Sequence, residues 1–213
     1  MNPNPEQWTR LLLVRHGESV GNLQDVWAGW SETPLSAVGR RQAADTAARL
    51  AQEGLGAVAL FSSPLSRAWQ TADVIGRALG HEPIVDESLK EMHFGDLECM
   101  QGRRFAEDHP TVYARWRDKT DEDFGWPGGE TRRQFRRRVS EAIARLAGAC
   151  NQQTALVVTH SGVIRMALAH LIPERFGAWW DVRVDNCSLT HVELGGSCRV
   201  RVPVVNDVGH LRQ

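Results

Sequence analysis

The chain has 213 residues, a length that suits one α/β domain and is sufficient to bury a substantial apolar core. Its 25 lysine and arginine residues balance 26 acidic residues, and the resulting formal charge of −1 argues against a nucleic-acid or membrane-surface protein. Residues 1–10 lack the apolar core of a secretory signal, and no apolar run approaches the ~20 residues of a membrane span. We therefore expect a single domain over residues 1–213 in a reducing, cytoplasmic setting.

The first expected strand is the apolar run Leu11–Val14, which stops abruptly at Arg15 and His16. In an open α/β sheet, ligands bind at the carboxyl ends of the strands, so the fold itself delivers both side chains to the expected site. Residues 18–34 are rich in glycine, asparagine, tryptophan and serine, which predicts a loop over this strand end.

Helix and strand patterns alternate through the next part of the chain. Ser36 caps a predicted helix that runs to about Glu53, and a strand over residues 57–61 follows it. A second helix is predicted over about residues 65–79, and residues 83–85 form a short candidate strand. This alternation is typical of an α/β fold with a parallel sheet.

Arg67 lies in the first turn of the second predicted helix. The helix dipole opposes a cation at that place, so local helix energetics do not explain the residue. A guanidinium beside a helix N-terminus makes an anion site, because it adds paired donors to the free backbone N–H groups. The alternative is an ordinary solvated arginine.

The composition changes in the middle of the chain. Residues 89–98 predict an irregular segment, in which Glu91 taken alone would be a solvated glutamate. Charged and aromatic residues from about 99 to 130 predict an inserted lid, with a helical part followed by an acidic loop. Helical spacing resumes at Thr131, and we interpret the arginine cluster within residues 132–138 as the solvated face of that helix.

A second buried strand is expected over Thr154–Thr159, and it is followed directly by His160. Like the first expected strand, it is an apolar run that ends at a histidine. Two histidines that each end an apolar strand can face one another across one crevice. We expect a helix over residues 163–171 and a closing hairpin over 188–204. The pattern leaves open whether Trp179–Trp180 belongs to the core, to a substrate-binding wall or to a dimer surface.

Four ordered blocks of sequence carry a resemblance to a known family. They are Arg15-His16-Gly17-Glu18 and the segments 62–68, 89–95 and 159–165. One tripeptide would be weak evidence, whereas four blocks in the order and structural context of a family are specific. On these blocks the chain resembles the histidine phosphatase superfamily, which includes the cofactor-dependent phosphoglycerate mutases. The resemblance implies a three-layer fold with a mostly parallel central sheet flanked by helices.

The resemblance also implies roles for five residues. His16 would be the nucleophile that takes up a phosphoryl group, and Arg15 and Arg67 would bind the phosphoryl oxygens. His160, if protonated, would add a third positive donor. Glu91 would protonate the departing oxygen and later activate water against the phosphohistidine. The scheme needs neither a metal nor a cofactor.

Two further polar residues are candidates for binding the substrate. Asn22 stands where the family has an asparagine near the transferred phosphoryl group, although stabilising a turn is an equally good interpretation. Ser161 stands where the family often has glycine, and it could narrow the pocket or add a hydrogen bond. The chain also departs from the family at Glu98-Cys99, where the family continues with Glu-Gly, and this departure puts the local backbone path in doubt.

The cysteines favour neither a metal site nor a redox motif, because they show no C-x-x-C pair and no regular spacing with histidine. We interpret them as small, partly buried thiols. They are Cys99, Cys150, Cys187 and Cys198.

Three functions are compatible with these residues: a phosphatase for small phosphate esters, a cofactor-dependent phosphoglycerate mutase, and a catalytically silent binding protein on the same fold. The resembling mutases generally carry a more basic lid, whereas here Arg115 and Arg117 are followed by acidic residues within 118–123. An acidic lid would repel a phosphoglycerate, so we favour the phosphatase. The expected partner is a small-molecule phosphate ester, and a homodimer is left open.

Overall fold

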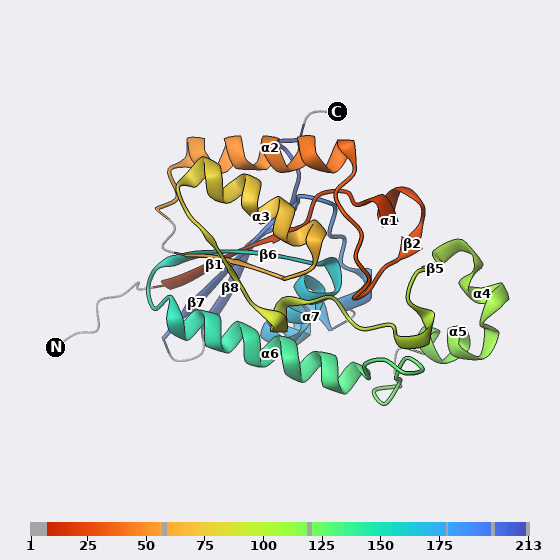
Figure 1. Cartoon of the computed structure of the whole chain (residues 1–213). Coiled ribbons are helices and arrows are strands. Elements are labelled where there is room, and N and C mark those ends of the chain that lie inside the picture. Colours follow the sequence, from red (N-terminus) through yellow and green to blue (C-terminus); the bar gives the residue numbers. More distant parts are fainter. Residues whose placement is uncertain (1–7, 57–58, 119–120, 178, 197–198, 212–213) are drawn as a thin grey trace.

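The computed structural model describes residues 8–56, 59–118, 121–177, 179–196 and 199–211. Its centre is a six-stranded sheet in the order β4-β3-β6-β1-β7-β8 (Figure 1). Four neighbouring strands, β4, β3, β6 and β1, run parallel, and β7 and β8 add an antiparallel hairpin at one edge. The strands are β1 (Trp8–Arg15), β3 (Ala59–Ser62), β4 (Pro83–Val85), β6 (Thr154–Thr159), β7 (Leu189–Gly195) and β8 (Arg199–Asp207).

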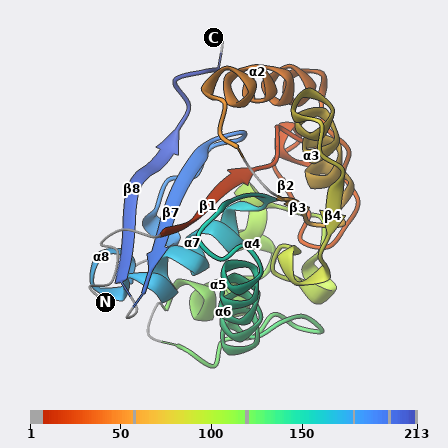
Figure 2. The same ribbon diagram turned by 90° about the vertical axis from the view of Figure 1, so that its left-hand side faces the viewer.

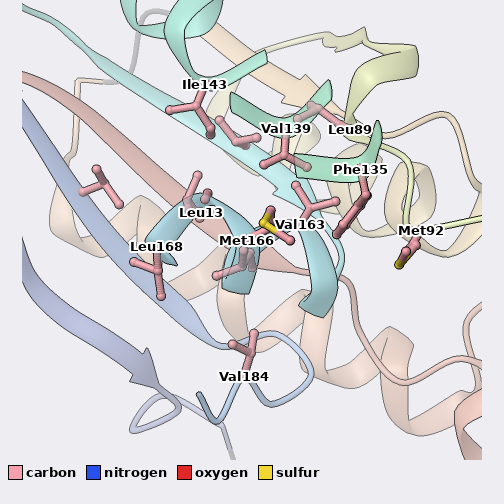
Figure 3. Packing of buried hydrophobic residues seen from close by; sticks show 14 of the residues in the cluster. Leu13, Leu89, Met92, Phe135, Val139, Ile143, Val163, Met166, Leu168 and Val184 are labelled. Carbon is pink, nitrogen blue, oxygen red and sulfur yellow. The ribbon is translucent and has the colours of Figure 1, made fainter. Parts of the chain in front are cut away.

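Helices cover both faces of the sheet, as the two views in Figures 1 and 2 show. The helices α2 (Ala37–Glu53) and α3 (Ser66–Leu79) lie on one face, and α6 (Arg132–Ala149) and α7 (Ser161–Leu171) lie on the other. Alternate residues of β1 enter two different cores, because successive side chains of a strand point to opposite faces. Leu12 packs in the first core, whereas Leu13 packs in the second, larger core that Figure 3 shows. The three-layer, mostly parallel prediction is confirmed.

The predicted helix ends agree with the structure where capping residues mark them. The Ser36 hydroxyl accepts the backbone N–H of Gly39 at the start of α2, and Gly54 ends the helix in the left-handed conformation at φ 58°. Thr131 and Gln134 form a capping box at the start of α6. The strand predicted over 57–61 is observed as β3, and residues 57 and 58 lie outside the described part of the chain.

The segment predicted as a loop after β1 contains a short helix, α1 (Val20–Leu23), and a two-residue strand, β2 (Val26–Trp27). The prediction of a plain loop is wrong here, because β2 pairs with β5 (Met100–Gln101) at the start of the lid. This pairing ties the lid to the first strand end. The lid continues through η3 (Gly102–Arg104), α4 (Phe105–Asp108) and α5 (Pro110–Arg117), at the right of Figure 1.

The arginine cluster of α6 is not a uniformly solvated face. Arg132 is buried, and it donates to the backbone oxygens of Trp116, Asp118 and Asp121 at 2.6–2.7 Å. These bonds tie the lid to α6. Arg138 is also mostly covered and forms an ion pair with Glu130 at 2.7 Å. Only the remaining arginines of the cluster, Arg133, Arg136 and Arg137, are exposed as predicted.

The acidic loop of the lid is compensated by arginines rather than presented to a ligand. Asp121 pairs with Arg115 at 2.8 Å, and Asp123 pairs with Arg133 at 2.7 Å. Glu122 likewise pairs with an arginine of α6 at 2.9 Å. Three of the four acidic residues behind the expectation of an anion-repelling lid are thus paired with arginines, which weakens that expectation.

The remaining short elements are η1 (Glu87–Leu89), η2 (Gly95–Leu97), α8 (Pro173–Phe176) and η4 (Trp179–Asp181). The predicted C-terminal hairpin is confirmed as β7 and β8, with Cys198 outside the described residues. Of the other cysteines, Cys150 and Cys187 are buried as expected, and Cys99 is exposed. Among the helices of the described ranges, none is long and apolar enough to cross a bilayer.

Candidate active site

The register of the sheet brings the two strand-end histidines together. Strands β1 and β6 are parallel neighbours, and Arg15 pairs with Thr159 at their carboxyl ends. The next residue on each strand is therefore a histidine at the same edge of the sheet. The rings of His16 and His160 lie 5.1 Å apart, edge to face, and the backbone N–H of His16 donates to the Thr159 oxygen at 2.9 Å.

His16 is held as a neutral base with a defined tautomer. Its Nδ1 lies 2.7 Å from the backbone oxygen of Gly17, and because a carbonyl only accepts, this nitrogen carries the proton. The lone pair is then left on Nε2. The residue is 4 % exposed, and burial together with the positive charges of Arg67 and Arg15 holds the pKa of His16 well below its ordinary value.

Two guanidinium groups flank the histidines. Arg67 is buried and donates to the backbone oxygens of Gly29 at 2.7 Å and Ser31 at 3.0 Å. Arg15 donates to the Val184 oxygen at 2.7 Å, and within the described chain its buried Nε has no partner. Burial lowers the pKa of Arg15 to about 10, so both groups remain cationic at neutral pH. Together they form a concentrated positive site at the end of β1.

Glu98 organises the loop that holds Arg67. One carboxylate oxygen accepts the N–H groups of Trp30 and Phe94 at 2.9 Å, and the other accepts the Ser31 N–H and hydroxyl. Cys99, the departure from the family pattern, has a φ of 62°, in the left-handed region that glycine adopts more easily. The backbone therefore follows a path suited to glycine although a cysteine occupies the position.

Glu91 reaches the site from the irregular segment after β4. Its carboxylate oxygens accept the backbone N–H groups of Met92 and Gly162, each at 2.9 Å. Gly162 must lack a side chain at this point, because a Cβ atom would lie 2.2 Å from the Glu91 Oε1. Arg138 supports the same segment from behind by donating to the backbone oxygens of Lys90 at 2.8 Å and Glu91 at 3.1 Å. The carboxylate is thus positioned from two sides.

His160 was expected to add a third positive charge only with its ring protonated. Its ring is fully buried, with Nε2 2.8 Å from the Ser63 hydroxyl, and Nδ1 has no partner among the described residues. Burial and the charges of Arg67, His16 and Arg15 hold its pKa well below the ordinary value. In the free site these effects favour a neutral imidazole, and a role of His160 as a positive donor to a bound phosphoryl group stays a prediction.

Asn22 and Ser161 both line the cavity beside these residues. The Asn22 side-chain oxygen accepts from the Ser19 N–H at 3.1 Å and from the Asn186 amide at 3.2 Å, so the turn-stabilising interpretation is confirmed. Its role toward a phosphoryl group stays a prediction. Ser161 is the first residue of α7, and its contact with a ligand likewise stays a prediction.

All the candidate residues except His160, which lies buried behind His16, line one cavity of about 370 Å³, a volume typical of small-molecule sites. Trp179–Trp180 form part of its wall, so the structure assigns this pair to the cavity. Arg165 also lines it, and its Nε donates to the Val182 oxygen at 2.7 Å. Our sequence reasoning gave Arg165 no role. Its spacing of one helical turn from Ser161 is the pattern that could have found it.

Comparisons with known proteins agree with this geometry. A family model described as "Histidine phosphatase superfamily (branch 1)" matches residues 11–207. The adenosylcobalamin/alpha-ribazole phosphatase of Escherichia coli is 35% identical over 188 residues, which cover 87% of this chain and 90% of the relative. A Mycobacterium tuberculosis protein described as bifunctional is 35% identical over 203 residues. That match covers 95% of this chain and 55% of the relative, so the chain spans about half the length of that protein.

Two solved structures are similar over nearly the whole chain. The alpha-ribazole phosphatase from Shigella flexneri has a TM-score of 0.81 at 30% identity, covering 93% of this chain and 96% of that one. A mycobacterial glucosyl-3-phosphoglycerate phosphatase in complex with VO3 also has a TM-score of 0.81, at 29% identity, covering 92% of this chain and 98% of that one.

Proposed function

Because the chain belongs to the histidine phosphatase superfamily (branch 1), we propose that it is a phosphoric monoester hydrolase acting through a phosphohistidine on His16. The observation that carries the proposal is the state of this ring. His16 is neutral, its proton is tied to the Gly17 oxygen, and the positive charges of Arg67 and Arg15 act on the ring. A neutral nitrogen next to concentrated positive charge is what attack on a dianionic phosphate ester requires.

The first half-reaction forms the phosphohistidine. The Nε2 lone pair of His16 attacks phosphorus, and the bond between phosphorus and the ester oxygen breaks. Arg15 and Arg67 neutralise the charge on the phosphoryl oxygens during this step. Glu91, entering as the carboxylic acid, gives its proton to the departing oxygen, so the alcohol leaves neutral.

The second half-reaction regenerates the enzyme. Glu91, now a carboxylate, takes a proton from water while the water oxygen attacks phosphorus, and the bond between phosphorus and nitrogen breaks. Inorganic phosphate leaves, and His16 returns to its neutral form. His160 lies against His16 as a neutral partner, and its Nδ1–H can donate a hydrogen bond to a phosphoryl oxygen once phosphate is bound.

We propose that this reaction runs on side chains alone, without a metal ion. A relative in Arabidopsis thaliana, 35% identical over 159 residues, is named a metal-independent phosphoserine phosphatase. Full activity in the presence of EDTA is the expected result. Loss of activity on chelation, with recovery when a divalent metal is restored, would contradict this part of the scheme.

Relatives named as phosphatases support hydrolysis over the mutase alternative. The charge of the lid contributes less to this choice, since Asp121, Glu122 and Asp123 are paired with arginines. The silent-binding alternative predicts the loss of at least one residue of the set, and all five, Arg15, His16, Arg67, Glu91 and His160, are present. Incubation with 3-phosphoglycerate, with and without a bisphosphate primer, separates the two enzymes by product: free phosphate or 2-phosphoglycerate. A cytoplasmic setting and a homodimer stay predictions.

The experiment that tests the proposal is trapping of the phosphoenzyme. Mixing the protein with a 32P-labelled phosphate ester and quenching in base should leave label on the wild-type chain and none on His16→Ala. His170→Asn, which changes an exposed histidine on α7, is the matched control and should retain both label and turnover. Thermal melting checks that each variant is folded. Substantial turnover by folded His16→Ala would refute the assignment of the nucleophile.

A further inference from the structure

The cavity has a second side that the phosphoryl chemistry does not use. Next to the arginines and histidines, five of the chain's eight tryptophans line it. They come from segments far apart in the sequence: β2, α5, the segment before α6, and η4. The five are Trp27, Trp116, Trp126, Trp179 and Trp180.

The indole rings pack on one another, so this wall exists before any ligand binds. Trp27 lies 5.4 Å from Trp116 and 6.2 Å from Trp126, in both cases edge to face. Trp179 and Trp180 form a second edge-to-face pair at 5.5 Å. Rings held in such pairs present fixed flat faces, and fixed faces favour a flat ligand over a flexible aliphatic one.

Two of these indoles also carry hydrogen-bond donors that the described protein atoms leave unused. The Nε1 of Trp126 and the Nε1 of Trp179 are buried without a partner within the described ranges. The Trp126 residue is only 4 % exposed. A buried N–H without an acceptor is unfavourable, and most such groups in proteins are satisfied. Both nitrogens are shielded from solvent, so an acceptor atom on a ligand reaches one of them only when the indole turns toward the cavity.

Charge is sparse on this side. Of the described residues that line the cavity, Arg165 is the one charged group outside the set of Arg15, His16, Arg67, Glu91 and His160 that we assign to the phosphoryl chemistry. A small, highly charged leaving group would find one cation there and leave the indole faces uncovered. A planar ring would cover them.

We propose that the preferred substrates are phosphate esters whose leaving alcohol carries a planar aromatic ring. The ring stacks against the tryptophan wall while the phosphate lies between Arg15 and Arg67. This inference rests on the proposed phosphatase function and names the substrate class of the same cavity.

The test compares esters that differ in the ring and not in the basicity of the leaving oxygen. Adenosine 5′-monophosphate and ribose 5-phosphate both release a primary ribose hydroxyl, with and without a planar base. The esters 2-phenylethyl phosphate and 2-cyclohexylethyl phosphate have similar apolar size and differ in aromaticity. We expect kcat/KM to be about tenfold higher for the aromatic member of at least one pair.

Variants of the wall assign the preference to the indoles. Trp179→Leu should reduce the aromatic preference to about threefold or less, and Trp179→Phe should retain part of it while losing the N–H donor. Trp69→Leu changes an exposed tryptophan of α3 outside the cavity, and it should leave the preference unchanged. Thermal melting shows whether each variant is folded.

The outcomes separate this inference from the function on which it rests. Equal kcat/KM within both pairs, in a wild-type protein that hydrolyses p-nitrophenyl phosphate, would overturn the substrate class and leave the phosphatase standing. A preference that survives unchanged in folded Trp179→Leu would overturn the role of the wall. Failure to hydrolyse any ester, p-nitrophenyl phosphate included, would overturn the proposed function itself.

Discussion

Gly162→Ala displaces Glu91 without altering any proposed catalytic side chain. A Cβ atom at position 162 would lie 2.2 Å from the Glu91 Oε1, whereas real Cβ contacts essentially never fall below 3.0 Å. The obstructing atom is the end of a flexible side chain, so the carboxylate moves rather than the fold. It must move by at least about 0.8 Å, the difference between these two distances. Its hydrogen bond from the Gly162 N–H is then distorted.

The expected cost is kinetic. A misplacement of about 1 Å in a group that transfers a proton lowers kcat about 100-fold, which corresponds to about 2.7 kcal/mol in the activation free energy. The loss should be largest for an alkyl ester, because its alcohol needs a proton to leave. With p-nitrophenyl phosphate the phenol leaves without that help, so the slow step becomes hydrolysis of the phosphohistidine. A rapid release of about one equivalent of p-nitrophenol, followed by slow turnover, is then expected.

Gly148→Ala is the matched control, because it also replaces a glycine inside a helix. No atom lies within 4 Å of a Cβ atom at position 148, so this change should retain wild-type kcat and add slightly to stability. Both variants should melt within a few degrees of the wild type. Wild-type turnover of an alkyl ester by Gly162→Ala would show that the position of Glu91 does not limit catalysis, and the assignment of the proton donor would have to be abandoned.

Three further predictions follow from strain, hydrogen bonding and protonation. Cys99→Gly should raise the free energy of unfolding by about 0.5–1 kcal/mol in denaturant titrations, because glycine adopts the left-handed φ of 62° more easily than cysteine. Cys99→Ala is the control and should not raise the free energy of unfolding. Arg138→Lys should lower kcat about tenfold with KM nearly unchanged, because one ammonium group cannot replace the paired hydrogen bonds that hold the Glu91 segment. Arg137→Lys, on the exposed face of α6, is the control and should leave kcat unchanged. Equal losses of kcat in the two variants would contradict the positioning role of Arg138. Below about pH 6.5, His16 and His160 become protonated in the unfolded chain but stay neutral in the folded one, because burial lowers their pKa values. The free energy of unfolding should therefore fall with decreasing pH, by up to about 1.4 kcal/mol per pH unit for each ring. His16→Asn should make that slope shallower, and a slope identical to that of the wild type would contradict a lowered pKa.

Much of the scaffold could be predicted because its signals are local. Periodic apolar residues and turn signals predicted α2 and α3 to within a residue or two and the start of α6 at Thr131, and the run Thr154–Thr159 agrees with β6 at both ends. The loop over residues 18–34 was mispredicted in part, since β2 exists only by pairing with β5 far along the chain. A two-residue strand has no periodicity of its own to detect.

The candidate site also has residues that local sequence signals reveal and residues whose role depends on long-range contacts. Its histidines and arginines stand at strand and helix ends, where polarity changes abruptly along the sequence, so Arg15, His16 and Arg67 could be singled out before the fold was known. Arg138 could not, because its value lies in hydrogen bonds to carbonyls some 47 residues away in sequence. The neutral state of His160 was equally hidden, since burial by the whole fold sets its pKa.

By itself the sequence determined which side chains end the strands, because a strand's apolar run and its polar end are written in consecutive residues. Only the tertiary structure decided what surrounds those ends: the compensated lid carboxylates, the supported Glu91 and the wall of indoles. These features depend on contacts between segments that are distant in the sequence and on how far the fold removes a side chain from water. A short stretch of sequence determines neither the contacts nor the desolvation.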